Sequence, residues 1–195
     1  MAKLPPTPAG EPHVIDFPVS WIGIDNGITG AFAVLRSTGI HTVVPVPVKQ
    51  LGGDRFIDAS ALVEMIRAEP NPQTIYEQGQ KQPKWGCKGN FANGFSHAVV
   101  DTVLEVLKVP YRGINPKTWQ EHAFKDMRGA AKAIAKDLDT KDCSIEFCRR
   151  TFPQVRLTRS DRCTVPDNNF ADALCMAWYA RNVVFRPEFL TALPK

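Results

Sequence analysis

Three carboxylates stand where the chain is expected to change from a buried segment to an exposed one. Asp25 ends an apolar segment, and Glu77 ends another. Asp172 lies near the start of the last long apolar segment. An acid at the end of a buried element is held rigidly where solvent, a metal ion or a phosphate can reach it. Carboxylate oxygens suit Mg²⁺, and two such ions about 4 Å apart promote displacement at phosphorus. If the three acids converge, the predicted chemistry is phosphodiester hydrolysis.

A fourth ligand is expected at the start of the last helix, where Asp167, Asn168 and Asn169 precede Asp172. At ~100° per residue, Asn168 and Asn169 lie within about 40° and 60° of Asp172, whereas Asp167 is about 140° away. A cap residue lies outside the helix, however, so the Asp167 carboxylate either turns towards the metals or accepts hydrogen bonds from helix amides. Both arrangements stay open, and we favour Asp167 as the fourth catalytic acid.

Apolar and β-branched segments predict five strands. They are expected at residues 21–24, 31–35, 40–48, 73–77 and 109–114. Asn26-Gly27 favours a hairpin between the first two strands, because both residues tolerate positive φ. The third strand continues an antiparallel meander, and its prolines place its end at an edge of the sheet. A helix between the last two strands makes a crossover, so these strands should be parallel.

Apolar residues at helical spacing predict the helices. They are expected at residues 58–67, 91–107, 116–122, 142–152 and 167–181, with a weaker pattern at 125–141 and loops at 78–90 and 154–166. Asp58 is the expected cap of the first helix. Pro116 suits the first turn of the third, where its missing N–H is not needed.

The chain is long enough for one well-packed domain and short for two, with 195 residues and 44% hydrophobic content. We expect a proline-rich flexible arm at 1–18, one domain at 19–187 and a tail at 188–195. No apolar run approaches ~18 residues, and the N-terminus lacks the apolar core of a signal peptide. The five cysteines form no Cys-x-x-Cys pair, which argues against a zinc module or a disulfide framework. A reducing compartment, cytoplasmic or nucleoid-associated, and no membrane contact are therefore expected.

Positive charge gathers in one part of the chain. Residues 81–162 carry 16 Lys and Arg against 9 Asp and Glu, and the rest carries 8 against 11. An acidic centre framed by basic residues suits a polyanion held around a metal site, although a solvated basic face without a partner has the same composition. The residues expected to contact phosphates or stack on bases are Lys81, Lys84, Trp85, Lys88, Lys117, Arg156, Arg159 and Arg162.

The order of these motifs, over most of residues 20–182, resembles the RuvC family of Holliday junction resolvases within the ribonuclease H-like superfamily. The matching stretches are Ile22-Gly-Ile-Asp25-Asn-Gly27, Tyr76-Glu77, the loop with Trp85 and Gly89, Gly94-Phe95-Ser96, Asn115-Pro-Lys-Thr-Trp119, Phe152-Pro153 and Asp172-Ala-Leu174. The order is most similar to the phage and chloroplast-type branch.

The chain departs from the family pattern at three places. Asn26 replaces the usual proline, and asparagines stand where relatives have an acid or histidine before Asp172. Gln120 stands where a lysine often follows the tryptophan, so Lys117 or another lysine is expected to contact the phosphate instead.

The resemblance implies an α/β fold, ribonuclease H-like, with a five-stranded mixed sheet flanked by helices. It also implies a homodimer that resolves four-way DNA junctions by paired symmetric nicks. The implied cofactor is Mg²⁺, with Mn²⁺ as a substitute, at two ions per site, held by Asp25, Glu77, Asp172 and Asp167 or Asn168.

Two other functions are compatible with parts of the sequence. The opening Ile-Gly-Ile-Asp-Asn-Gly-x-Thr-Gly also resembles the phosphate-binding hairpin of sugar kinases and actin-like ATPases, but those proteins need two such domains. A binding module that recognises branched DNA without cutting it is the other, since the late asparagines weaken the metal site. Metal-dependent nicking of a junction separates the two.

Overall fold

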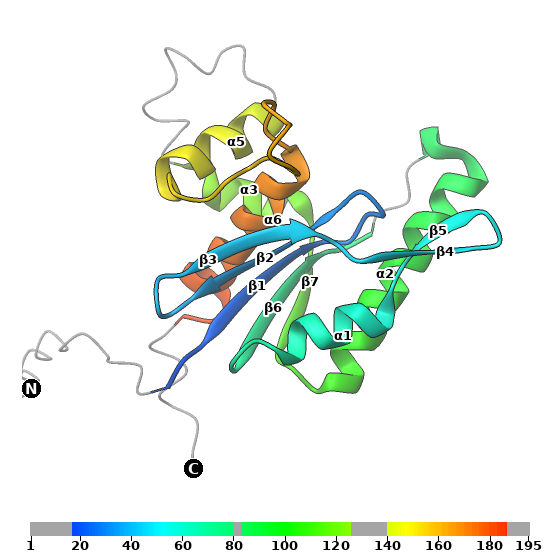
Figure 1. The fold of residues 1–195 in the computed structure, drawn as a ribbon, viewed down its shortest axis with the longest axis horizontal. Helices are drawn as coiled ribbons and strands as arrows, with labels where there is room; N and C mark the ends of the chain where they lie inside the picture. Colours follow the sequence, from blue (N-terminus) through cyan, green and yellow to red (C-terminus); the bar gives the residue numbers. More distant parts are fainter. Residues whose placement is uncertain (1–16, 80–82, 126–139, 187–195) are drawn as a thin grey trace, which may run out of the picture.

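The computed structural model describes residues 17–79, 83–125 and 140–186 (Figure 1). The strands are β1 (Ser20–Asp25), β2 (Ala31–Arg36), β3 (His41–Pro45), β4 (Val48–Leu51), β5 (Asp54–Ile57), β6 (Pro72–Glu77) and β7 (Tyr111–Ile114). The helices are α1 (Ala59–Arg67), η1 (Pro83–Trp85), α2 (Gly86–Leu107), α3 (Pro116–Ala123), α5 (Thr140–Thr151), α6 (Asn168–Tyr179) and the π-helical turn η2 (Ala180–Val184).

Five strands form one mixed sheet in the order β3-β2-β1-β6-β7. β1, β2 and β3 are antiparallel neighbours, whereas β6 pairs in parallel with both β1 and β7. The predicted meander, the edge position of β3 and the crossover through α2 are thus confirmed. This order places β1 in the middle of the sheet, beside the strand that ends at Glu77.

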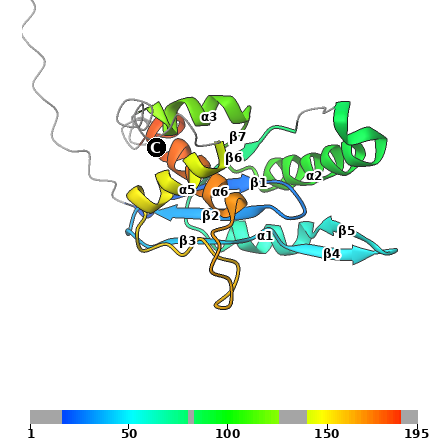
Figure 2. The same cartoon turned by 90° about the horizontal axis from the view of Figure 1, so that it is seen from above.

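Helices cover both faces of the sheet, as Figures 1 and 2 show. Side chains alternate along a strand, so Ile22 and Ile24 of β1 pack against α1 and α2. Trp21 projects from the opposite face and packs among residues of α3, α5 and α6. Because Asp25 has the same parity as Trp21, its side chain belongs to the face that α6 covers.

Gly23 lets α6 approach β1 directly. A Cβ built on Gly23 would lie 2.1 Å from the carbonyl oxygen of Ala173 and 2.5 Å from the nitrogen of Ala177. Both atoms belong to the helix backbone, which has little freedom to move. No residue with a side chain fits here without separating the strand of Asp25 from the helix of Asp172.

Gly23→Ala is therefore expected to lower the free energy of unfolding by roughly 2 kcal/mol, the cost of overpacking a core, as measured by urea denaturation. Gly94→Ala is the control, because a Cβ there meets nothing within 4 Å and alanine favours the helix. A Gly23→Ala variant as stable as wild type would mean that α6 does not lie this close to β1.

The prediction of a single strand at 40–48 is wrong. β3 ends at Pro45, and the chain then forms a separate two-stranded sheet of β4 and β5. Pro45 and Pro47 have no N–H to continue the ladder, and Gly52 and Gly53 close the new hairpin with φ of +59° and +88°. The hairpin extends beside the first turns of α2 (Figure 2).

Other boundaries differ by a few residues. The helix predicted from Phe91 already begins at Gly86, so most of the predicted loop 78–90 is helical. The strand predicted from Val109 begins at Tyr111, after Lys108 has adopted a φ of +54°. The capping predictions for Asp58 and the placement of Pro116 are confirmed.

Three predicted segments lie largely or wholly outside the described residues: the arm 1–18, the weak helix 125–141 and the tail 188–195. Within the described part of the chain, no helix is long and apolar enough to cross a membrane.

Candidate active site

Asp25 and Glu77 lie at the same end of two adjacent strands. β1 and β6 are parallel, and their last paired residues are Ile24 and Tyr76. The next residue on each strand is the acid. Both acids project from the face that α6 covers, because side chains two residues apart share a face and Ile75 packs in the α6 core.

Asp172 joins them from α6. It precedes Ala173, whose carbonyl oxygen lies against Gly23 of β1. One carboxylate oxygen of Asp172, Oδ1, is buried and has no hydrogen-bond partner among the described residues. A buried oxygen without a partner is costly, which is typical of a ligand position.

Burial and neighbouring charges raise the pKa of each of the three carboxyls. Burial raises the pKa of Glu77 to about 8, and the charges of Asp25 and Asp172 contribute to this rise. Burial also raises the pKa of Asp172 to about 7, with Ser144 opposing and Asp25 adding to the shift. The charge effects of Asp25 on Glu77 and Asp172, and of Asp172 on Glu77, require the carboxylates to be close, so the structure brings together the three acids predicted from sequence.

The pKa of Asp25 rises less, to about 6. Burial is the main cause, while the Gly27 N–H and the charge of Arg159 lower the pKa and the charge of Asp167 raises it. The Gly27 N–H donates to Oδ1 of Asp25 over 3.4 Å. The turn after β1 thus helps to orient the first acid.

The predicted use of positive φ at Asn26-Gly27 is wrong, because neither residue adopts it. The turn instead runs to Gly30, whose N–H donates to the Gly27 carbonyl over 2.8 Å. A Cβ on Gly30 would lie 1.9 Å from the carbonyl oxygen of Asp25. Gly30 is the residue that this tight turn requires.

Asp167 is the N-cap of α6, one of the two arrangements left open by the sequence. Its Oδ1 accepts hydrogen bonds from the amides of Asn169 and Phe170, at 2.9 Å and 3.3 Å. Its Oδ2 pairs with Arg159. Its charge still raises the pKa of Asp25 and Asp172, so it lies at the margin of the cluster while serving as a cap.

Asp167→Ala is expected to cost on the order of 1 kcal/mol of unfolding free energy, because the cap is lost. Asp167→Asn should cost less, since asparagine also caps helices. Chemical denaturation of both variants checks this. Equal stability of both variants and wild type would mean that the cap contributes nothing.

The residues fit a hard cation in their donor chemistry. The three acids offer only oxygen, which Mg²⁺ prefers, and a bound cation would favour their charged forms, which burial disfavours. Within the described ranges, no group of three or more His, Cys, Asp and Glu side chains is already arranged to hold a metal ion.

Four of the residues predicted to contact DNA precede β7 in the sequence, and the three that the structure describes lie in η1 and in the first turn of α2. Lys84 is exposed in η1, and Trp85 belongs to the same turn. Lys88 is exposed in the first turn of α2, with its Nζ 3.7 Å from Asp54 of the β4–β5 hairpin. Lys81 lies outside the described residues.

The later basic residues differ in their surroundings. Lys117 is exposed on α3, and Arg162 is exposed in the connection between α5 and α6. Arg156 donates to Asp161 within that connection. Arg159 instead reaches Asp167 and the carbonyl of Thr29, so it is occupied by contacts within the protein.

Two groups at the site were missed from the sequence. Ser144 of α5 is fully buried and lowers the pKa of Asp172. It lies three and four residues before Phe147 and Cys148, and this helical spacing with apolar residues could have indicated that Ser144 is buried. The Thr29 carbonyl accepts from both Arg159 and Asn169. No sequence signal marks a backbone acceptor.

The central strand β1 has an antiparallel neighbour on one side and two parallel strands on the other, and helices cover both faces of the sheet. This arrangement defines the ribonuclease H-like fold, so the prediction of that fold is confirmed. Among solved structures, that of RuvC from Thermus thermophilus is similar to the structure of this chain. The match has a TM-score of 0.44 and 19% sequence identity, and it covers 84% of this chain and 95% of that chain. No protein-family model matches the chain, and no curated protein matches it.

Proposed function

We propose that this protein is a metal-dependent endonuclease that resolves four-way DNA junctions by paired symmetric nicks. The observation that carries the proposal is the convergence of Asp25, Glu77 and Asp172 from three elements at one end of the sheet, where the charges of Asp25 and Asp172 raise the pKa of Glu77 and that of Asp25 also raises the pKa of Asp172. Buried acids with strongly shifted pKa values are typical of functional sites.

In this proposal the three acids hold Mg²⁺, or Mn²⁺ in its place, with Asp167 or Asn168 completing the site. Two bound ions supply activation of the attacking water and stabilisation of the leaving 3′ oxygen. The chain's own contribution is orientation. The turn amide of Gly27 orients the Asp25 carboxylate. The close packing of the α6 backbone on Gly23 determines how near Asp172 lies to β1.

The basic residues supply the affinity for DNA. Phosphate contacts are proposed for Lys81, Lys84, Lys88, Lys117, Arg156 and Arg162, with stacking by Trp85. Lysine and arginine contacts release counterions, so binding should weaken steeply as salt rises. Preference for a branch over linear duplex is proposed to come from Trp85, which would stack on an unpaired base.

The decisive experiment is a cleavage assay on a labelled four-way junction with Mg²⁺, with Mn²⁺ and with a chelator. The proposal expects paired nicks at symmetric positions with either ion and none with the chelator. Binding without nicks under all three conditions would contradict the nuclease.

A junction-binding protein that does not cut is the second candidate. Two observations favour it: the acids of the described residues form no ready metal group, and both carboxylate oxygens of Asp167 are occupied. Calorimetry with Mg²⁺ alone separates the candidates, because only the nuclease requires the acids to bind the ion.

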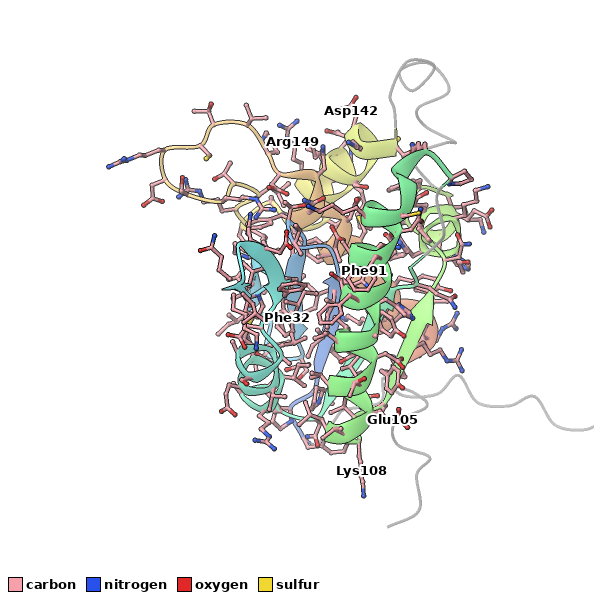
Figure 3. All side chains as sticks on the ribbon, turned by 90° about the vertical axis from the view of Figure 1, so that its right-hand side faces the viewer. Phe32, Phe91, Glu105, Lys108, Asp142 and Arg149 are labelled. Atoms are coloured by element: carbon pink, nitrogen blue, oxygen red, sulfur yellow. The ribbon has the colours of Figure 1, made fainter. Side chains whose placement is uncertain are left out.

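The proposed homodimer needs a surface on which a second copy can pack. α2 presents apolar side chains to solvent: Phe91 is 69% exposed, Phe95 40% and Val106 70%. Figure 3 looks onto this side, with Phe91 on the outward side of α2 and Glu105 and Lys108 towards its other end. A shallow apolar hollow adjoins it, lined by Ala59, Phe95, Ala98, Val99, Thr102 and Val103. An exposed apolar stripe along one helix suits a symmetric helix contact.

Phe91→Glu and Val106→Glu are each expected to weaken dimerisation by about 30-fold or more, because a charge would be placed in an apolar contact. Sedimentation velocity over a range of protein concentrations measures this. Val165→Glu is the control, since Val165 is also apolar and 77% exposed but lies in the connection between α5 and α6. If all three variants sediment as wild type, the α2 surface is not the interface.

A further inference from the structure

Arg159 lies in the connection between α5 and α6 and contacts two other parts of the molecule. Its Nε donates to Oδ2 of Asp167, and its Nη2 donates to the carbonyl oxygen of Thr29. Its guanidinium carbon lies 5.3 Å from the centre of the Phe170 ring. A guanidinium makes such contacts together because its donors point in fixed directions and its flat face stacks. A lysine has a single charged nitrogen and cannot make all three.

The other two arginines of the connection behave differently. Arg156 donates to the carboxylate of Asp161 and to the carbonyl of Ser160, both within five residues of itself. Arg162 is exposed. Arg159 therefore differs from its neighbours in joining segments that are far apart along the chain.

The Thr29 carbonyl is held from two sides. The side-chain amide of Asn169, in the first turn of α6, donates to it over 2.7 Å, in addition to Arg159. Thr29 belongs to the turn that follows Asp25, and the Gly27 N–H of that turn donates to the Asp25 carboxylate. Hydrogen bonds at both ends of this turn, joined by its backbone, thus connect the start of α6 to Asp25.

We infer that Arg159 is a positioning residue, which holds turn 26–30 against the N-terminus of α6 and so sets Asp25 relative to Asp167 and Asp172. These contacts of Arg159 with Asp167 and Thr29, called the Arg159 clamp below, are a property of the fold. Their effect on metal binding rests on the proposed function. This role is the alternative to the DNA contact that the sequence predicts for Arg159.

Hydrogen exchange of the metal-free protein tests the clamp itself. Arg159→Gln should speed exchange of the amides in residues 26–30 by about tenfold or more, the factor expected from loss of a charge-assisted hydrogen bond. Exchange in the rest of β1 and β2 should stay unchanged. Arg162→Gln is the matched control and should leave the turn as in wild type. Unchanged exchange in the Arg159 variant would overturn the inference.

Calorimetric titration with Mg²⁺, without DNA, tests the consequence. Arg159→Gln should weaken binding by about tenfold, and Arg159→Lys should recover part of the loss. Asn169→Ala and Arg159→Gln together should cost more than the product of their separate effects, because both side chains hold the same carbonyl. Independent effects would mean that the two donors do not share the turn.

Junction binding in chelator separates positioning from phosphate contact. Arg159→Gln should keep the wild-type dependence of affinity on salt, whereas loss of a phosphate contact lowers that slope by about one. A lowered slope with normal Mg²⁺ binding would make Arg159 a DNA contact and overturn the inference. If wild type binds no Mg²⁺ at all, the proposed nuclease fails, while the exchange result still decides the clamp.

Discussion

Asp25→Asn is expected to reduce junction cleavage by about 10³-fold or more while binding stays intact or becomes tighter. Asparagine keeps the shape of the side chain but removes the charge that holds a cation against the phosphate, a contribution of several kcal/mol to the barrier. Junction binding should be preserved because the negative charge of Asp25 repels the DNA phosphates and does not contribute to affinity. Single-turnover cleavage of a labelled junction, with a parallel binding titration in chelator, measures both quantities.

Glu105→Gln is the matched control for that variant, because Glu105 is an exposed acid of α2 (Figure 3) and its charge is removed in the same way. It should cut at the wild-type rate. Nicking by Asp25→Asn at the wild-type rate in moderate Mg²⁺ would remove Asp25 from the active site and, with it, the main support for the proposed chemistry.

Glu77→Gln is expected to stabilise the metal-free protein at pH 8 and to change it little at pH 5. The folded pKa of Glu77 is about 8, against an ordinary value of 4.5. A raised pKa means that the folded state binds the proton more tightly, so the stabilisation is complete below pH 4.5 and is lost as pH rises towards 8. Glutamine does not ionise, so the variant does not lose stability as the pH rises.

The expected gain at pH 8 is on the order of 3 kcal/mol, or roughly 5–10 °C in Tm. Scanning calorimetry at pH 5 and pH 8, with chelator and with Mg²⁺, measures it. The ion should raise the Tm of wild type more at pH 8 than at pH 5, since the acids must be ionised to bind it, and it should raise that of Glu77→Gln less. Parallel curves of Tm against pH for wild type and variant would show that Glu77 is not buried among acids.

The sequence by itself determined the features that depend on residues close together in the chain. The predicted cap Asp58 bonds the amides two and three residues ahead, and Pro116 lies in the first turn of α3 as predicted; such features follow from local geometry. The placement of Asp25 and Glu77 at strand ends follows from the apolar residues that precede them. The same local signals misplaced the third strand, because β3 ends at Pro45 and a separate hairpin begins at Val48, after Pro47.

Only the tertiary structure decided how these parts meet. Pairing β1 with β6 puts Asp25 beside Glu77 and partly buries both, and this burial is the main cause of their raised pKa values. The partners of Arg159 and Asn169 at Thr29 lie 130 and 140 residues away. No periodicity reports a contact across such a separation, since it forms only when the sheet, α6 and the connection before it have packed. For that reason the structure shows what the sequence could not, that Arg159 donates a hydrogen bond to the turn that follows Asp25.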